Sequence, residues 1–226
     1  MLDDKERIVA TLQLMHGGDV VEVRALKCGQ YGSTWSGYFD DYELAAEAAL
    51  EAEEAGSAGV YTLLNKLHGG VIARSPNIFS KRAAKTTTET DIVARNWLLV
   101  DFDPVRPSGI SSTAEELGKA KLASKIVYDI LSESTEGELI RACSGNGFHV
   151  LAPLTGKPDV GRIKKTLKIL AANVSHIEGI DVDMSVTKLN QLTKLYGTKA
   201  TKGFSTADRP HRTSYILTPN LERYHG

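Results

Sequence analysis

The sequence has few of the features that mark membrane, secreted or zinc-binding proteins. It contains only two cysteines in 226 residues, Cys28 and Cys143, and they lie far apart. Two distant cysteines do not form a zinc knuckle, and they fit a reducing cytoplasm. No apolar run is long enough for a transmembrane helix, and the acidic N-terminus is not typical of a secretory signal. We therefore expect a cytoplasmic protein without a membrane partner.

Charge is unevenly distributed along the chain, although the net charge is only −1. Residues 1–56 carry four Lys or Arg and twelve Asp or Glu, whereas residues 185–226 carry seven Lys or Arg and two Asp or Glu. The basic C-terminal part is a candidate surface for phosphate groups. A solvated basic face explains the same counts equally well, so the counts alone leave both interpretations open.

The periodicity of apolar residues predicts both helices and strands. Helical spacing is present in four segments: 3–15, 41–56, 111–134 and 159–175. Alternating or continuous apolar runs predict a hairpin over 137–154 and strands at 19–27, 33–40, 58–65, 97–100, 179–186 and 213–217. We expect residues 66–92 to form a long loop, and Leu122, Ile126 and Ile130 to mark the apolar face of the third helix. The order strand, helix, hairpin, helix, strand after residue 96 favours an antiparallel sheet backed by helices.

Two acids follow the most apolar of these strands, in "WLLVDFDP". Asp101 and Asp103 are two residues apart, so on a strand their side chains point to the same face. Their charges repel unless a cation lies between them, and Mg²⁺ prefers oxygen ligands of this kind. The alternative is a strand-to-loop junction in which Asp-Phe-Asp-Pro is only turn chemistry. The pair by itself does not decide between a metal site and a turn.

The segment "CSGNGFHV" has the character of a phosphate-binding turn. It places Ser144, Gly145, Gly147 and His149 around the turn of the predicted hairpin. Glycine lets the backbone approach a ligand closely, and the local N–H groups can donate to phosphate oxygens. A plain turn followed by a structural histidine is the alternative.

A third segment, "IDVDMSV", repeats the pattern of acids on a strand with Asp181 and Asp183. The cation-rich stretches "TKLYGTKATKG" and "RPHR" come after it. Acids on strands, a turn that suits phosphate and a cationic loop together are the inventory of two-metal nucleotidyl transfer.

In combination, these segments resemble the archaeo-eukaryotic primase superfamily, in particular the primase–polymerase domains of phages, plasmids and related mobile elements. The resemblance covers most of the chain through "VVEVRAL", "SGYFDD", "GVYTLLN", "WLLVDFDPVRPSGISST", "SGNGFHVL", "VDMSV", "KLYGT" and "RPHR", in the order of that family. It implies one α+β catalytic domain over residues 1–226. An N-terminal α/β lobe of about 1–95 would be joined to an RRM-like antiparallel catalytic sheet of about 96–226, backed by helices, with the active site in the cleft between them.

The resemblance also implies roles for individual residues. Asp101 and Asp103 match the first metal-binding motif, and Asp183 matches the acid of the third, because the family's acid is the one followed by x-Ser-Val. These three acids are expected to be catalytic and to hold two Mg²⁺ or Mn²⁺ ions, with Asp181 outside the metal site. The residues expected to bind the nucleotide are Ser144, Gly145, Gly147, His149, Lys194, Arg209, His211 and Arg212. Those expected to bind nucleic acid are Lys188, Lys199 and Lys202.

The activity that the resemblance implies is template-directed nucleotidyl transfer. NTP or dNTP would be added on a single-stranded DNA template and primer, by a DNA primase, a DNA polymerase or both, in the replication of a mobile element. Larger relatives carry a helicase, so a helicase domain or protein is an expected partner. The sequence departs from the family at Lys188 and Gln191, where relatives often carry Asn and Arg, and the fine contacts to nucleotide or template at these positions are not implied.

Two other classes of protein share part of this pattern. A phosphohydrolase of the haloacid-dehalogenase type also begins with Asp-x-Asp after an apolar strand, and Val105 fits its next position loosely. That class leaves Ser-Gly-Asn-Gly-Phe-His unexplained. A non-catalytic RRM-like module reads bases with aromatic side chains on its sheet, where paired acids would repel the phosphate backbone. The primase–polymerase interpretation explains all of the segments together.

Overall fold

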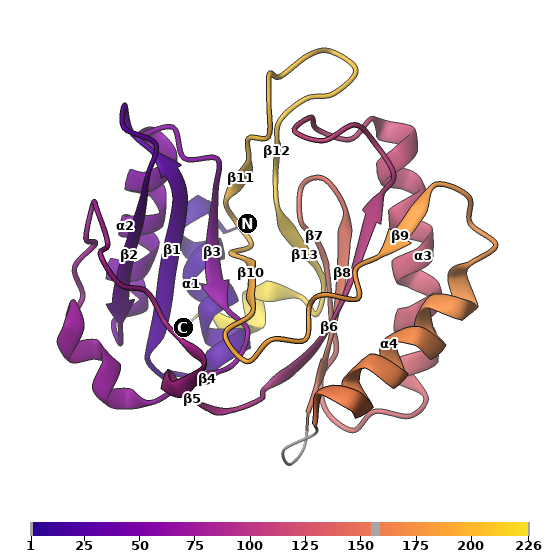
Figure 1. Ribbon diagram of the computed structural model, residues 1–226, viewed down its shortest axis with the longest axis horizontal. Helices are drawn as coiled ribbons and strands as arrows, with labels where there is room; N and C mark the ends of the chain where they lie inside the picture. Colours follow the sequence, from indigo (N-terminus) through magenta and orange to yellow (C-terminus); the bar gives the residue numbers. More distant parts are fainter. Residues whose placement is uncertain (1, 155–158, 226) are drawn as a thin grey trace.

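The chain folds into two sheets that lie side by side (Figure 1). The computed structural model describes residues 2–154 and 159–225. The first sheet is antiparallel and has the strand order β10-β3-β1-β2. Its strands are β1 (Val21–Cys28), β2 (Ser33–Phe39), β3 (Gly59–Leu63) and β10 (Leu192–Lys194). Helices α1 (Asp4–His16) and α2 (Tyr42–Glu54) lie behind this sheet in Figure 1 and contact each other.

Both helices of the first sheet begin at an aspartate whose side chain accepts backbone N–H groups. Asp3 forms a capping box with Glu6 at the start of α1, and Asp41 accepts from the first turn of α2. Such caps satisfy N–H groups that have no partner inside the helix. The buried face of α2 consists largely of alanines, which let the helix pack close to the sheet. The predicted helices at 3–15 and 41–56 are confirmed.

The second sheet is also antiparallel, with the strand order β13-β7-β8-β6-β9. Its elements are β6 (Trp97–Pro104), α3 (Ala114–Ser132), β7 (Ile140–Cys143), β8 (Phe148–Pro153), α4 (Val160–Val174), β9 (Ile180–Val182) and β13 (Tyr215–Thr218). The two helices cover the face of the sheet that turns away from the first sheet (Figure 1). The predicted antiparallel sheet backed by helices is therefore confirmed, and the hairpin is β7 with β8.

Helix α3 packs through a different face from the predicted one. Leu122 is 52% exposed, and Ile126 and Ile130 are only partly buried. The buried face instead consists of Ala120, Ala123, Ser124, Val127 and Leu131. This set also has helical spacing. Its mostly small side chains bring the helix close to the sheet, where Ser124 Oγ accepts a hydrogen bond from Arg141 Nε at 3.0 Å.

Short elements missed by the periodicity connect the two sheets. Strand β10 lies between β9 and β13 of the second sheet in the chain but pairs with β3 of the first sheet. Strands β11 (Lys199–Ala200) and β12 (Arg212–Thr213) form a two-stranded ribbon, and the loop between them projects at the top of Figure 1. The remaining short elements are β4 (Lys66–Leu67), η1 (Gly69–Arg74), η2 (Glu89–Asp91), β5 (Ile92–Ala94) and η3 (Leu221–Tyr224). Throughout residues 2–154 and 159–225, every helix is too short or too polar to cross a membrane.

Candidate active site

A cavity of about 140 Å³ lies where the two sheets meet. Tyr61 of β3 and Lys194 of β10 reach it from the first sheet, and Asp101 of β6 and His149 of β8 reach it from the second. The residues that line it are Ala58, Tyr61, Leu99, Asp101, Asp103, Ser144, Asn146, His149, Asp183, Val186, Gln191, Leu192, Thr193, Lys194, Ala200 and Lys202. The cavity therefore contains all three predicted catalytic acids and four of the predicted nucleotide-binding or nucleic-acid-binding residues.

The three acids come from neighbouring strands. Strand β6 continues through the acids to Pro104, so Asp101 and Asp103 share one face. Asp103 pairs in register with Asp181 of β9, and the backbone N–H of Asp183 donates to the Asp101 carbonyl at 3.0 Å. Asp183 thus follows the end of β9 and lies beside Asp101. Asp183 lines the cavity, whereas Asp181 is exposed and is not among the described lining residues.

The carboxylates of Asp103 and Asp183 each contact a residue close in the sequence. Asp103 Oδ1 is 3.4 Å from Arg106 Nη1, and Asp183 accepts from the backbone N and the hydroxyl of Ser185 at 2.7 and 3.0 Å. Burial and the charge of Asp101 raise the pKa of Asp103, while Arg106 acts in the opposite direction. Within residues 2–154 and 159–225, no three His, Cys, Asp or Glu side chains are close enough to hold one metal ion.

One buried carboxylate oxygen in the cavity makes no well-formed hydrogen bond among the described residues. It is Asp101 Oδ1, whose neighbouring donor is His149 Nε2 at 3.3 Å. Unpaired buried polar atoms are rare in folded proteins and often mark the place of a bound ion, water or ligand. Carboxylate oxygens are ligands that suit Mg²⁺ and Mn²⁺. The donor set of this cavity therefore fits a hard divalent cation.

His149 is buried next to the acids. It pairs in register with Asp101, and its Nε2 lies 3.3 Å from Asp101 Oδ1. Its Nδ1 forms a 2.7 Å hydrogen bond with the hydroxyl of Tyr196, whose pKa is raised by burial. The tyrosine thus fixes the ring, while Nε2 faces the acids and the cavity.

The turn between β7 and β8 approaches the acids closely. The backbone N–H of Ser144 donates to the Gly147 carbonyl, and the N–H of Gly147 donates to Ser144 Oγ. A Cβ at Gly147 would lie 2.5 Å from the Phe102 carbonyl oxygen and 3.0 Å from Asp103 Oδ1, so only glycine fits there. Gly145 has a φ of +96° and touches the β11–β12 ribbon at Ala200 instead of the cavity.

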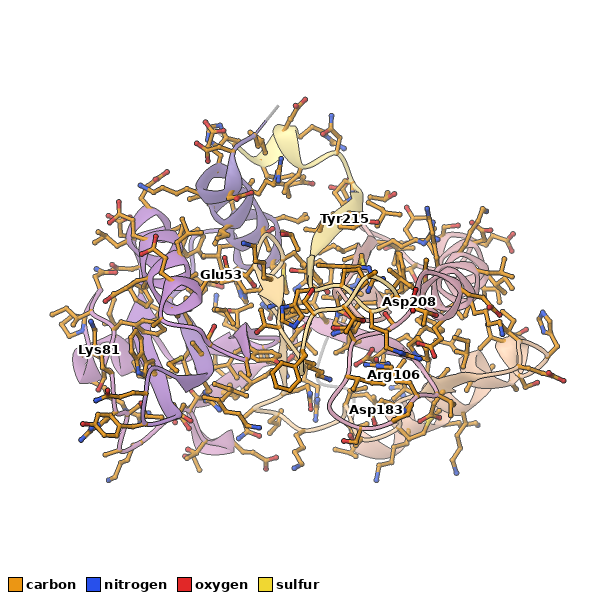
Figure 2. All side chains as sticks on the ribbon, turned by 90° about the horizontal axis from the view of Figure 1, so that it is seen from above. Glu53, Lys81, Arg106, Asp183, Asp208 and Tyr215 are labelled. Carbon is orange, nitrogen blue, oxygen red and sulfur yellow. The ribbon has the colours of Figure 1, made fainter. Side chains whose placement is uncertain are left out.

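Lys194 is a buried cation at the first-sheet side of the cavity. Its Nζ donates to the Lys199 carbonyl at 2.7 Å and lies 5.6 Å from the centre of the Tyr61 ring. Burial lowers the pKa of Lys194 to about 7, although Glu53 acts in the opposite direction. The pKa of Tyr61 is raised by burial and by the charges of Asp101 and Asp103. Figure 2 shows Glu53 on the first-sheet side of the molecule and Asp183 on the second.

The other predicted residues have partners away from the described cavity lining. Arg209 forms a two-pronged ion pair with Glu116, with two contacts of 2.8 Å, and also donates to the Ser111 carbonyl. Arg212 donates to the Ser112 carbonyl at 2.8 Å. The last three residues are placed as follows: Lys188 is exposed, and His211 and Lys199 line a second hollow of about 760 Å³ beside Glu53.

The sequence did not point to several residues of the cavity. Tyr61, Asn146, Thr193 and Tyr196 either line it or hold a residue that does. The sequence places Tyr61 only on a predicted strand. In the structure it is the one half-buried residue of β3, whose other residues are buried. Pairing of β3 with β10 brings it next to Lys194, and a pairing over this sequence distance is not visible in local periodicity.

Comparison with known proteins identifies the fold. No protein-family model and no curated protein matches the sequence. Among solved structures, the primase–polymerase domain of cyanophage S-2L superposes with a TM-score of 0.52 at 11% identity, over 97% of this chain and 95% of that one. The primase RepB′ gives a TM-score of 0.53 at 9% identity, over 98% of this chain and 62% of that one. The catalytic domain of RepB′, in complex with initiator DNA, gives 0.50 at 8% identity over 98% and 94%.

The fold follows from this agreement over nearly the whole chain. The chain has a primase–polymerase fold of the archaeo-eukaryotic primase type. The predicted resemblance is thereby confirmed for the fold.

Proposed function

We propose that this protein is a template-directed nucleotidyltransferase, a DNA primase, a DNA polymerase or both. The observation that carries the proposal is the position of Asp101, Asp103 and Asp183 in one cavity between the two sheets of a primase–polymerase fold. The RepB′ catalytic domain with this fold is described in complex with initiator DNA. We extend that kind of partner, a DNA strand, to the present chain, together with NTP or dNTP as substrate.

Asp101, Asp103 and Asp183 are proposed to hold two Mg²⁺ or Mn²⁺ ions. The Oδ1 of Asp101, which makes no well-formed hydrogen bond, and the three carboxylates of the cavity lining support this role. The chemistry that such ions supply is activation of a 3′-hydroxyl group and neutralisation of the triphosphate. Asp183 is already oriented by Ser185, and Asp103 by Arg106.

The triphosphate is proposed to lie against the second-sheet turn and the buried lysine. Ser144 offers its hydroxyl proton, because its oxygen already accepts from Gly147. His149 offers Nε2, because Tyr196 holds Nδ1. Lys194 offers positive charge from the first-sheet side of the cavity. Gly147 has a steric role, because the absence of a side chain lets the turn approach Asp103.

The surrounding basic residues, Lys202 of the cavity lining among them, are proposed to contact phosphates of the nucleotide, the template or the primer. Arg212 and Lys199 belong to the β11–β12 ribbon, and Arg209 and His211 to the loop between its strands. Lys188 precedes β10. Phosphate contacts of this kind give affinity without sequence preference. The proposed partners are a single-stranded template, a primer and, in a larger assembly, a helicase domain or protein; the proposed setting is replication of a mobile element.

The arrangement of the second sheet supports an RRM-like catalytic core. Its chain order is β6, α3, β7, β8, α4 and β9, and its spatial order places β8 and β6 in the centre. The proposed lobes are about 1–95 and about 96–226, with β10 crossing to the first sheet. A phosphohydrolase is less well supported, because the Ser144–His149 turn and Lys194 would have no part in it. A binding module is less well supported, because carboxylates occupy the exposed centre of the sheet.

Incorporation of a labelled nucleotide tests the proposed function. The full chain is incubated with primed and with unprimed single-stranded DNA, with dNTP or NTP, and with Mg²⁺, Mn²⁺ or a chelator. We expect incorporation that requires the metal and is absent from Asp101→Ala. Release of inorganic phosphate from small phosphate esters, without incorporation, would favour the phosphohydrolase. DNA binding with neither reaction would favour the binding module.

A further inference from the structure

We propose that Phe204, in the loop of residues 201–211 between β11 and β12, is a stacking platform for a base of single-stranded DNA. This inference rests on the proposed function and adds a residue that contacts DNA through its ring instead of its charge. The loop projects beyond both sheets in Figure 1. Its neighbour Lys202 lines the cavity that contains the acids.

The exposure of Phe204 is unusual for this chain. Its side chain is 91% exposed, the highest value among the large apolar side chains that the structure describes. Phe39, Phe102 and Phe148 are at most 1% exposed. A single exposed apolar residue needs no explanation by itself. What suggests a ligand for this ring is its position on a held, cationic loop, of which Lys202 lines the cavity.

The loop is held in place by the segment before α3. Ser111 Oγ donates to the Lys202 carbonyl at 3.3 Å, and Arg209 donates to the Ser111 carbonyl at 2.7 Å. Within the loop, His211 Nε2 lies 2.9 Å from the Gly203 carbonyl. Gly203 has a φ of +65°, and a Cβ there would lie 2.3 Å from the Gly109 carbonyl oxygen. A platform fixed in this way loses little conformational entropy when a base stacks on it.

The charge around the ring selects a polyanion. Residues 199–212 contain Lys199, Lys202, Arg209 and Arg212 and one acid, Asp208, and Arg209 is also paired with Glu116 outside the loop, so the loop keeps an excess of positive charge. Proteins that bind single strands combine such cations, which follow the phosphates, with aromatic rings, on which successive bases stack. Because Lys202 is two residues from Phe204 and lines the cavity, a base on Phe204 belongs to a strand that enters the site of the three acids. The geometry points to the template or primer strand and not to the free nucleotide.

The test compares three variants of the full chain: Phe204→Ala, Phe204→Trp and a control, Ile169→Ala. Ile169 is 56% exposed on α4 and lies outside the loop. Affinity for a fluorescein-labelled oligodeoxynucleotide is measured by anisotropy, and stacking by quenching of 2-aminopurine placed along the strand. We expect Phe204→Ala to weaken strand binding about five- to a hundredfold and to abolish quenching at one position. Phe204→Trp should retain both, and Ile169→Ala should change neither.

Unchanged strand affinity and unchanged quenching in Phe204→Ala would overturn the inference. If the wild-type protein self-associates and Phe204→Ala loses only that, the ring belongs to an interface between copies, and the inference is again overturned. Nucleotide incorporation by the wild type separates these results from the proposed function. If the wild type incorporates nucleotides but Phe204→Ala binds the strand normally, only the stacking role of Phe204 is contradicted. If Phe204 stacks on the strand but the wild type incorporates no nucleotide, only the proposed nucleotidyltransferase function is contradicted.

Discussion

Asp101 and His149 lie directly opposite each other on the neighbouring strands β6 and β8, with Asp101 Oδ1 3.3 Å from His149 Nε2. The other ring nitrogen is held by Tyr196 at 2.7 Å. The histidine therefore joins the acids to a tyrosine of the segment after β10, and its ring cannot turn without breaking that bond. One register pairing brings the proposed metal ligands and the proposed phosphate contact into the same cluster.

Replacement of any one of the three acids should abolish nucleotide incorporation while the fold is retained. Asp101→Ala, Asp103→Ala and Asp183→Ala each remove a proposed metal ligand. Incorporation is measured on a primed template, and folding by circular dichroism. Asp181→Ala is the matched control, because Asp181 is exposed and pairs with Asp103 from outside the described cavity lining. Loss of activity in Asp181→Ala alone would transfer the third ligand to that residue.

In metal-free buffer, Asp103→Asn should leave stability unchanged or raise it. The carboxyl pKa of Asp103 is raised by burial and by Asp101, so its charged form is disfavoured in the folded state. Its side chain is 45% exposed and near Arg106, which limits the gain to below about 1 kcal/mol, or about 2–4 °C in Tm. Added Mn²⁺ should stabilise the wild type more than the variant. Equal stabilisation of both by Mn²⁺ would argue against Asp103 as a ligand.

His149→Ala should weaken nucleotide binding. Loss of one charge-assisted contact of about 1.5–3 kcal/mol corresponds to a rise in the nucleotide KM of about ten- to a hundredfold. Tyr196→Phe is the informative companion, because it keeps the buried ring but releases Nδ1 of His149. We expect it to have a smaller effect in the same direction. Direct titration of His149→Ala with nucleotide that shows wild-type affinity would make His149 a structural residue only.

Nucleotide affinity should fall as the pH rises above about 7, because of Lys194. Burial lowers the pKa of its amine to about 7 in the free protein. A bound triphosphate favours the charged amine, so binding takes up a proton at higher pH, and the apparent affinity falls by up to about tenfold per pH unit. Below pH 7 the amine already carries its proton and this dependence disappears. Calorimetry between pH 7.5 and 9 should show proton uptake in the wild type and in Lys188→Met, an exposed lysine, but not in Lys194→Met.

Lys202→Ala should weaken strand binding in a salt-dependent way. Each neutralised phosphate of a single strand contributes about −0.7 to the slope of log affinity against log salt, so the slope should flatten by less than one unit for every sequence alike. Lys81→Ala is the control, since Lys81 lies at the far end of the first sheet (Figure 2) and pairs with Glu51. If the slope flattens in Lys81→Ala and does not change in Lys202→Ala, the strand binds on the first lobe. Arg212→Ala distinguishes a strand contact from a triphosphate contact. Loss of a triphosphate contact raises the nucleotide KM and leaves the salt slope of strand binding unchanged.

Much of the second sheet was predictable because it depends on local backbone geometry. The two-residue spacing of Asp101 and Asp103 places both on one face of any strand, and the glycines of "CSGNGFHV" mark the turn that joins β7 to β8. The face of α3 was not predictable in the same way. Leucine and isoleucine at helical spacing look like a core, yet the face that packs on the sheet is Ala120, Ala123, Ser124, Val127 and Leu131.

The sequence by itself determined which chemical groups are available, namely acids, glycines and cations at fixed spacings. Only the tertiary structure decided which of these groups meet. His149 and Tyr196 are 47 residues apart, and Arg209 and Glu116 are 93 apart. Lys194 becomes a buried amine only because β10 pairs with β3. Local spacing depends on the backbone of a few residues, whereas burial and cross-strand pairing depend on the packing of the whole chain, and this is why the second set of facts could not be predicted.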